Sequence, residues 1–233
     1  MKRLGLVLLI ALLLPRTASA WTRVADERIA KKGAALAPPD LRLLIDKFDS
    51  DYKKGLDRGD AEEGEAHRRA QLKQRIAKET RGVIAMIRGN EPMAGIVERL
   101  GTIAHLVSDA NSPFHVTGEL KLKPDYEAYF ERRMPKFPTV FYGLDPAFRL
   151  DAYLDRTFAR STKFYPLVAE EYSRAPHESS LDFDDRSTAF GVASICYSRA
   201  VTDLVNVYYY IWREAGGDVR TAPVMRKSNL VVR

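Results

Sequence analysis

The strongest constraint on the fold is a long amphipathic pattern near the C-terminus. Large apolar residues recur there at steps of three and four, at Phe190, Ala193, Tyr197, Val201, Leu204, Val207, Tyr208, Ile211 and Trp212. This period places them on one face of a helix, and the Gly216-Gly217 pair supplies a C-terminal stop. The pattern predicts one long apolar helix over 183–215 that anchors the rest of the chain.

The remainder of the chain shows the same helical period and no strand-like alternation of any length. The predicted helices are 24–35, 39–56, 61–88, 93–110, 125–134, 145–172 and 183–215. Proline-rich and glycine-containing segments separate them. About seven helices with short connections predict an all-α, single-domain bundle, in which facing helices can project ligands toward an interior metal cluster.

The first 20 residues have the pattern of a secretory signal peptide. Lys2 and Arg3 precede an apolar run over 4–14, and Ala18-Ser19-Ala20 is an A-x-A cleavage site. We expect cleavage after Ala20, a domain over 21–233 that begins with Trp21, and a periplasmic or secreted product. No later run is long and apolar enough to predict a transmembrane segment.

Charge and cysteine content narrow the possible partners. The net charge of +6 falls to about +3 once Lys2, Arg3 and Arg16 are removed, which is too mild to indicate a nucleic-acid or anionic-lipid surface. Cys196 is the only cysteine and lies in an apolar helical run, so we expect a buried, inert thiol and no internal disulfide. Nothing in the sequence indicates an obligate protein partner.

Two of the four histidines lie within eleven positions, at 105 and 115. Beside the apolar stripe of the helix predicted over 93–110 runs a polar line of Glu98, Thr102, His105 and Asp109. Pro113 ends that helix just beyond and turns His115 back from a loop. Two imidazoles and a carboxylate at one point can hold a divalent metal. Spacing alone equally permits a hydrogen-bonded His-Asp pair on a half-buried face.

A tryptophan follows the predicted signal peptide, and a His-x3-Asp-x5-His pattern ends in Asn-Ser-Pro-Phe-His. In these two features the sequence resembles the zinc-dependent phospholipase C and single-strand-specific nuclease superfamily. Members of that superfamily are all-helical secreted phosphodiesterases with up to three zinc ions. The order of the other candidate ligands follows the family along nearly the whole mature chain. The resemblance therefore implies zinc as the cofactor and a phosphodiester as the substrate.

By this resemblance, one zinc ion is held by the N-terminal residue. The freed amino nitrogen and carbonyl oxygen of Trp21 would chelate it, because a free α-amine with a pKa of about 8 can deprotonate to bind metal. Asp26 stands near the place of a family histidine, so it offers an oxygen ligand instead. The alternative for Trp21 is an aromatic packing anchor.

The resemblance assigns a second ion to Asp60, His67, His105 and Asp109. Asp60 follows a segment that resembles the family's Gly-x3-Pro-Asp turn, with Gly59 in place of the proline. The counterpart of Asp109 also bridges to the ion at the N-terminus. The alternative for Asp60 is a helix N-cap, and for His67 a solvated face of a charged helix.

A third ion would use His115 and Glu127. Lys123 stands where the family has a histidine, and a lysine is cationic at neutral pH and a poor zinc ligand. This site is therefore incomplete, with Asp125 as a possible substitute ligand and Lys123 able to offer its charge to a phosphate. His177 lies in a polar loop without a family counterpart and is expected to be solvated.

The resemblance implies hydrolysis of a phosphodiester, because bound zinc lowers the pKa of a water from 15.7 to about 7. We expect Asp60 to orient or deprotonate the attacking water, and phospholipid head groups to be the substrate. One alternative is a single-strand nuclease, in which Trp21, Phe114 and Tyr126 would stack on bases. Another is a divergent metal-binding or partner-binding member without turnover, which the departures at Asp26 and Lys123 motivate.

Overall fold

The computed structural model describes residues 21–61, 69–119 and 121–220, without the side chains of residues 60, 61, 69 and 70. Within these ranges it contains nine α-helices, two 3₁₀ segments and no strand. The elements are α1 (Arg23–Ala35), α2 (Pro39–Lys47), α3 (Asp49–Ala61), α4 (Arg69–Arg88), α5 (Met93–Ala110), α6 (Pro113–Thr117), α7 (Lys123–Arg133), η2 (Met134–Lys136), α8 (Leu150–Arg174), η3 (Pro176–Glu178) and α9 (Thr188–Glu214). The predicted all-α bundle is confirmed.

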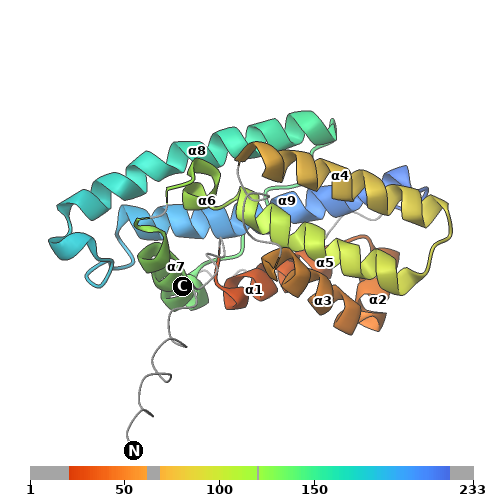
Figure 1. Cartoon of the computed structure of the whole chain (residues 1–233), viewed down its shortest axis with the longest axis horizontal. Coiled ribbons are helices and arrows are strands. Elements are labelled where there is room, and N and C mark those ends of the chain that lie inside the picture. The colour runs from red at the N-terminus through yellow and green to blue at the C-terminus, as the bar shows by residue number, and fades with distance from the viewer. Residues whose placement is uncertain (1–20, 62–68, 120, 221–233) are drawn as a thin grey trace, which may run out of the picture.

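Helices α5 and α9 form the centre of the bundle (Figure 1). All residues from 100 to 110 in α5 and from 200 to 209 in α9 are buried. Helices α3 and α4 pack against α5, while α1 and α8 pack against α9. The apolar anchor predicted near the C-terminus is thus central, and α9 ends as expected just before Gly216, whose φ is +88°.

Differences from the sequence expectation at Phe48 and at Pro113 have identifiable physical reasons. The helix predicted over 39–56 is two helices, because the backbone at Phe48 leaves the helical region (φ −114°, ψ 38°) and its N–H closes α2 on Leu44 O. The loop predicted to carry His115 is the short helix α6. Pro113 ends α5 and also occupies the first turn of α6, where its missing N–H is tolerated.

The helix predicted from residue 145 begins only at Leu150, because Asp145 starts a turn in which its Oδ1 accepts from the N–H of Ala147 at 2.9 Å and its carbonyl oxygen from the N–H of Phe148 at 3.2 Å. Residues 138–145 follow the side of α9, where the N–H groups of Val140, Tyr142 and Asp145 donate to Ser198 Oγ, Thr202 Oγ1 and Asn206 Oδ1 at 3.1, 3.1 and 2.7 Å. These three acceptors are spaced one helical turn apart. Because the backbone donors are satisfied by side chains of α9, the segment does not need a helix of its own.

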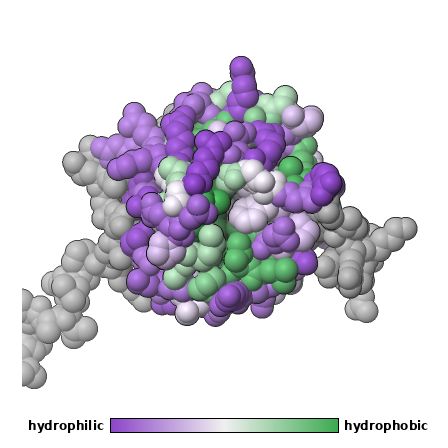
Figure 2. Space-filling view, turned by 90° about the vertical axis from the view of Figure 1, so that its right-hand side faces the viewer, coloured by the Kyte–Doolittle hydropathy of each residue, from purple (hydrophilic) through white to green (hydrophobic). Residues whose placement is uncertain are grey.

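The described surface carries a mixed pattern of polar and apolar residues. On the end of the molecule that lies at the right of Figure 1, hydrophilic residues predominate and a smaller hydrophobic area lies low in the view (Figure 2). In the described residues, no helix is long and apolar enough to cross a membrane. Cys196 is buried as predicted, and burial raises the pKa of its thiol to about 12. The predicted signal peptide over 1–20 lies outside the described residues.

Candidate metal centre

Helix α5 carries the two residues at the centre of the site. His105 and Asp109 lie one turn apart on the same face, with His105 Nε2 3.2 Å from Asp109 Oδ2. His105 is 1% exposed and Asp109 is fully buried. The predicted neighbourhood of this histidine and aspartate is therefore confirmed, but on a fully buried face rather than a half-buried one.

Asp26 approaches His105 from the first turn of α1. Its Oδ2 atom lies 3.2 Å from His105 Nδ1, so the two ring nitrogens of the histidine face two different carboxylates. Burial raises the pKa of Asp26 to about 6. Burial by itself lowers the pKa of His105, but the carboxylates of Asp109 and Asp26 outweigh it and raise this pKa well above its usual value.

Helix α3 reaches the site through a close approach that only glycine allows. A Cβ atom on Gly59 would lie 2.6 Å from Cδ2 of His105 and 2.7 Å from its Cγ. One turn earlier, a Cβ on Gly55 would lie 1.8 Å from the carbonyl oxygen of Glu98. The predicted turn over 55–60 is therefore wrong. These residues belong to a helix, and its glycines allow the α3 backbone to lie directly on α5 and on the imidazole.

The polar residues predicted along one side of α5 hold α3 against that helix. Glu98 accepts from Lys54 and Arg58, each at 2.8 Å, and Thr102 Oγ1 donates to Gly55 O at 3.0 Å. Asp57 points elsewhere and pairs with Arg23 at 3.0 Å on the surface. The side chain of Asp60 and the whole of His67 lie outside the described residues. Gly59, which directly precedes Asp60, lies against the ring of His105.

His115 lies on α6 and approaches the same aspartate. Its Nε2 atom is 3.9 Å from Asp109 Oδ2, and its side chain is 6% exposed. The Oγ atom of Ser112 caps α6 by accepting from the backbone N–H of His115 at 3.4 Å, which fixes where the helix starts. The structure thus gathers Asp26, His105 and Asp109 around one buried point, with His115 beside Asp109.

Trp21 packs beside this cluster as an aromatic anchor. Its indole Nε1 donates to Ser108 O at 2.9 Å, and its ring lies 4.0 Å from that of Phe130 between centroids. The side chain is fully buried. These contacts hold the start of α1, and therefore Asp26, against the end of α5. Whether the amino nitrogen of Trp21 is a metal ligand stays a prediction.

Glu127, one of the two residues predicted for a third ion, forms an ion pair with Lys123, which stands where the family has a histidine. Lys123 is 3% exposed, and its Nζ lies 3.7 Å from Glu127 Oε1, one turn along α7. Asp125 is engaged differently, because its carboxylate accepts from Tyr172 OH at 2.7 Å and from the N–H of Ser180 at 3.0 Å. Asp125 therefore holds the loop after α8 in place. Whether His115 and Glu127 hold a further ion stays a prediction.

The aromatic residues considered for base stacking are all in the core. Trp21, Phe114 and Tyr126 are fully buried, with centroid distances of 4.7 Å between Phe114 and Tyr126 and 6.2 Å between Trp21 and Tyr126. Rings buried against each other offer no face to a nucleotide, so the expectation that they stack on bases is wrong. His177 is exposed in η3 as predicted.

Sequence reasoning missed Asp203, which lies on α9 and accepts hydrogen bonds from four side chains behind the site. The available signal was a carboxylate within the long apolar helix α9. A buried charge of this kind requires partners. The identity of those partners depends on how α8 and the end of α5 pack, which the spacing of residues along the chain does not reveal.

The donor set around Asp109 fits a divalent ion. Neighbouring ligands of a tetrahedral zinc ion, with bonds of about 2.0–2.1 Å, lie about 3.4 Å apart, and His105 Nε2 and Asp109 Oδ2 are 3.2 Å apart. Ligand atoms of Asp26, His105 and Asp109 all lie within 4.8 Å of one another. Asp26 Oδ1 is buried without a hydrogen bond within the described part of the chain. The same geometry also suits a protonated His105 held between two carboxylates.

No family model and no curated protein matches the sequence. Among solved structures, the fold is similar to that of the Clostridium perfringens alpha-toxin isolated from avian strain SWCP, with a TM-score of 0.63 and 12% sequence identity. The match covers 88% of this chain and 66% of the toxin chain, so this protein spans about two thirds of the toxin's length. The likeness establishes a shared fold.

Proposed function

We propose that this protein is a metal-dependent phosphodiester hydrolase that acts outside the cytoplasm, with phospholipid head groups as its substrate and zinc as its metal. The observation that carries the proposal is the buried cluster of Asp26, His105 and Asp109, with His115 beside it. It coincides with the motif that resembles zinc-dependent phospholipases C. The fold shared with alpha-toxin is consistent with this assignment.

The two ring nitrogens of His105 suggest a division of roles. Nε2 faces Asp109 and Nδ1 faces Asp26, and an imidazole offers a metal ion one nitrogen at a time. We assign His105 Nε2 and Asp109 as metal ligands, with His115 next to them. Asp26 then accepts the Nδ1 proton, which fixes the tautomer and orientation of the ring. This makes Asp26 a positioning residue rather than the oxygen ligand expected from the sequence.

When bound, zinc supplies a Lewis acid for the phosphoryl oxygens and lowers the pKa of water toward neutrality. Asp60 is the residue we propose to orient or deprotonate the attacking water. Its support is the resemblance, together with the contact between Gly59 and the ring of His105. The burial of the cluster excludes bulk solvent, which strengthens every electrostatic interaction made there.

A metal-binding protein without turnover is the second candidate function. The buried ion pair between Lys123 and Glu127 favours it, because a lysine ammonium at this position already supplies a positive charge to the carboxylate. Such a chain would hold fewer ions than the three found in the family it resembles.

The test is an assay of purified chain starting at Trp21, loaded with zinc, on phosphatidylcholine vesicles. We expect release of phosphorylcholine, and its loss in His105→Ala. His177→Ala is the matched control, because it removes an exposed histidine far from α5 in the chain. A zinc-loaded protein that releases neither phosphorylcholine nor nucleotides from single-stranded DNA would overturn the enzyme assignment and favour binding without turnover.

A further inference from the structure

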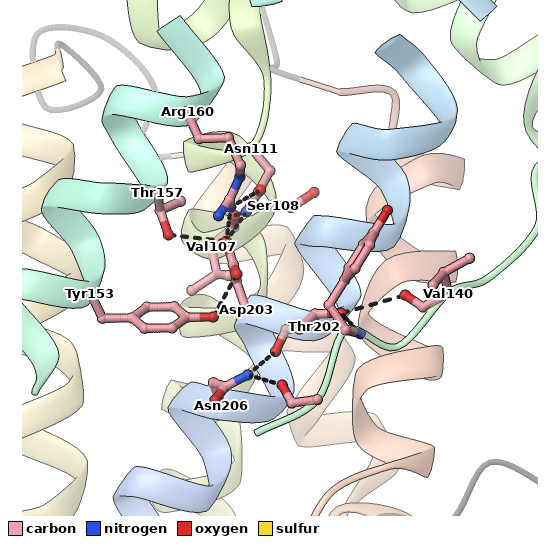
Figure 3. A network of polar contacts seen from close by, with 12 residues as sticks. Val107, Ser108, Asn111, Val140, Tyr153, Thr157, Arg160, Thr202, Asp203 and Asn206 are labelled. Atoms are coloured by element: carbon pink, nitrogen blue, oxygen red, sulfur yellow. Dashed lines mark hydrogen bonds and ion pairs between the residues drawn. The ribbon is translucent and has the colours of Figure 1, made fainter. Parts of the chain in front are cut away.

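Asp203 is the centre of a buried polar network behind the candidate metal centre (Figure 3). Its side chain is 2% exposed. Tyr153 OH donates to Oδ1 at 2.7 Å, and Oδ2 accepts from Asn111 Nδ2 and Thr157 Oγ1 at 3.1 Å each and from Arg160 Nη2. Four donors and one guanidinium charge compensate the burial of this carboxylate.

The network reaches the site through Asn111, which lies two residues after Asp109. Besides donating to Asp203, Asn111 Nδ2 donates to Val107 O at 3.0 Å, and Asn111 Oδ1 accepts from Arg160 Nη2 at 3.0 Å. Both ends of the amide are therefore engaged. In Figure 3 the side chains of Asn111 and Arg160 converge on Asp203 from α5 and α8. The last turn of α5 is thereby tied to two other helices.

Asn111 also sets the turn that delivers the second histidine. Its backbone N–H donates to Ser108 O, and the N–H of Ser112 donates to Asp109 O, each at 3.0 Å. Ser112 then caps α6, which carries His115. The direction of α6 relative to α5, and with it the 3.9 Å separation of His115 Nε2 and Asp109 Oδ2, depends on this turn.

We infer that Asp203 is a positioning residue for the metal centre: through Asn111 it fixes the turn that places Asp109 and His115 side by side. This inference rests on the proposed function, because it assumes that the two residues hold a metal. Asp203 acts through the amide of Asn111, and Arg160 keeps that amide in one orientation because it donates to both Asn111 Oδ1 and Asp203 Oδ2.

Asp203→Asn tests the inference. The new amide keeps an acceptor for Tyr153 but can place an NH₂ group against the donors of Asn111, Thr157 and Arg160. We expect the dissociation constant for Zn²⁺, measured by competition with a chelator, to rise at least about tenfold, the lower range for residues that orient metal ligands. We also expect the visible absorption spectrum of the Co²⁺-loaded protein to change, which a general loss of stability would not produce.

Asn206→Ala is the matched control, because Asn206 lies one turn further along α9 and holds residues 143–145 instead. It should lower the melting temperature and leave metal affinity and the Co²⁺ spectrum unchanged. If Asp203→Asn does not fold, Tyr153→Phe removes one of the four donors and should produce a smaller shift in the same direction. An unchanged affinity and spectrum in the folded Asp203 or Tyr153 variant, or an equal loss of affinity in Asn206→Ala, would overturn the inference. A wild-type protein that binds no metal would overturn the proposed function and this inference with it.

Discussion

Replacing Gly59 with alanine should disturb the candidate metal centre from the side of α3. The added Cβ would lie 2.6–2.8 Å from three atoms of His105, which is closer than real Cβ contacts allow. The ring cannot simply move away, because Asp26 and Asp109 face its two nitrogens at 3.2 Å each. Either α3 shifts outward or the imidazole leaves its carboxylate partners.

The size of the effect follows from two opposing contributions. An alanine inside a helix is favoured over glycine by about 0.5–1 kcal/mol, whereas overpacking a well-filled site costs about 1–3 kcal/mol. Gly191→Ala carries the first contribution alone, because Gly191 is an exposed helical glycine of α9 with no atom within 4 Å of its Cβ position. The difference in unfolding free energy between the two variants should therefore be about 1–3 kcal/mol.

Urea unfolding followed by circular dichroism measures this difference, and a chelator competition measures zinc affinity in the same samples. Gly59→Ala should unfold at lower urea concentration than wild type and bind zinc more weakly. Gly191→Ala should be slightly more stable than wild type with unchanged affinity. Equal stability of the two variants, together with equal zinc affinity, would show that α3 does not press on His105 as the geometry indicates.

Further outcomes follow from the same structure. Cys196, whose thiol pKa is raised to about 12 by burial, should resist a disulfide reagent at pH 8 in the folded protein and react at once in denaturant; fast reaction of the folded protein would contradict its burial. Lys123→His should raise the number of zinc ions bound per chain, measured by elemental analysis, because it gives Glu127 an imidazole neighbour in place of an ammonium; an unchanged number would show that the missing histidine is not the cause. One extra residue before Trp21 should abolish activity, and full activity in that chain would remove the Trp21 amine from the site. With metal removed by EDTA, the contribution of His105 to folding stability should be complete below about pH 6.5 and should decline as the pH rises toward its elevated pKa. The reason is that, in this pH range, folded His105 holds a proton that the unfolded chain releases. Thermal melts in EDTA that show rising stability from pH 6.5 to 8 would contradict this sign.

Local sequence signals predicted much of the fold and the neighbourhood of His105 and Asp109 in the candidate site. The bounds of α5 were predicted residue for residue, because a continuous apolar stripe lies between Pro92 and Pro113. The same spacing placed His105 and Asp109 side by side. Helical period also predicted α9, but placed its start at residue 183, whereas Ser187 caps the helix by accepting from Phe190 N–H and α9 begins at Thr188.

The sequence did not predict which side chains meet across helices that are distant along the chain. The pairing of Asp26 with His105 depends on how Trp21 docks α1 against Ser108, and the Asp203 network depends on α8 packing across α5 and α9. Gly59 looked like part of a turn because glycine signals turns and close packing equally well. Its role became visible only with α5 in place.

The proposed metal centre is tested most directly by an anomalous diffraction map, collected at the zinc edge on crystals of the chain starting at Trp21 after growth with zinc. We expect a peak within bonding distance of His105 Nε2 and Asp109, with Asp26 hydrogen-bonded to His105 Nδ1 and outside the coordination sphere. A map without a peak at this cluster, with His105 held between the two carboxylates, would show that the cluster is a buried ion-pair triad and not a metal centre.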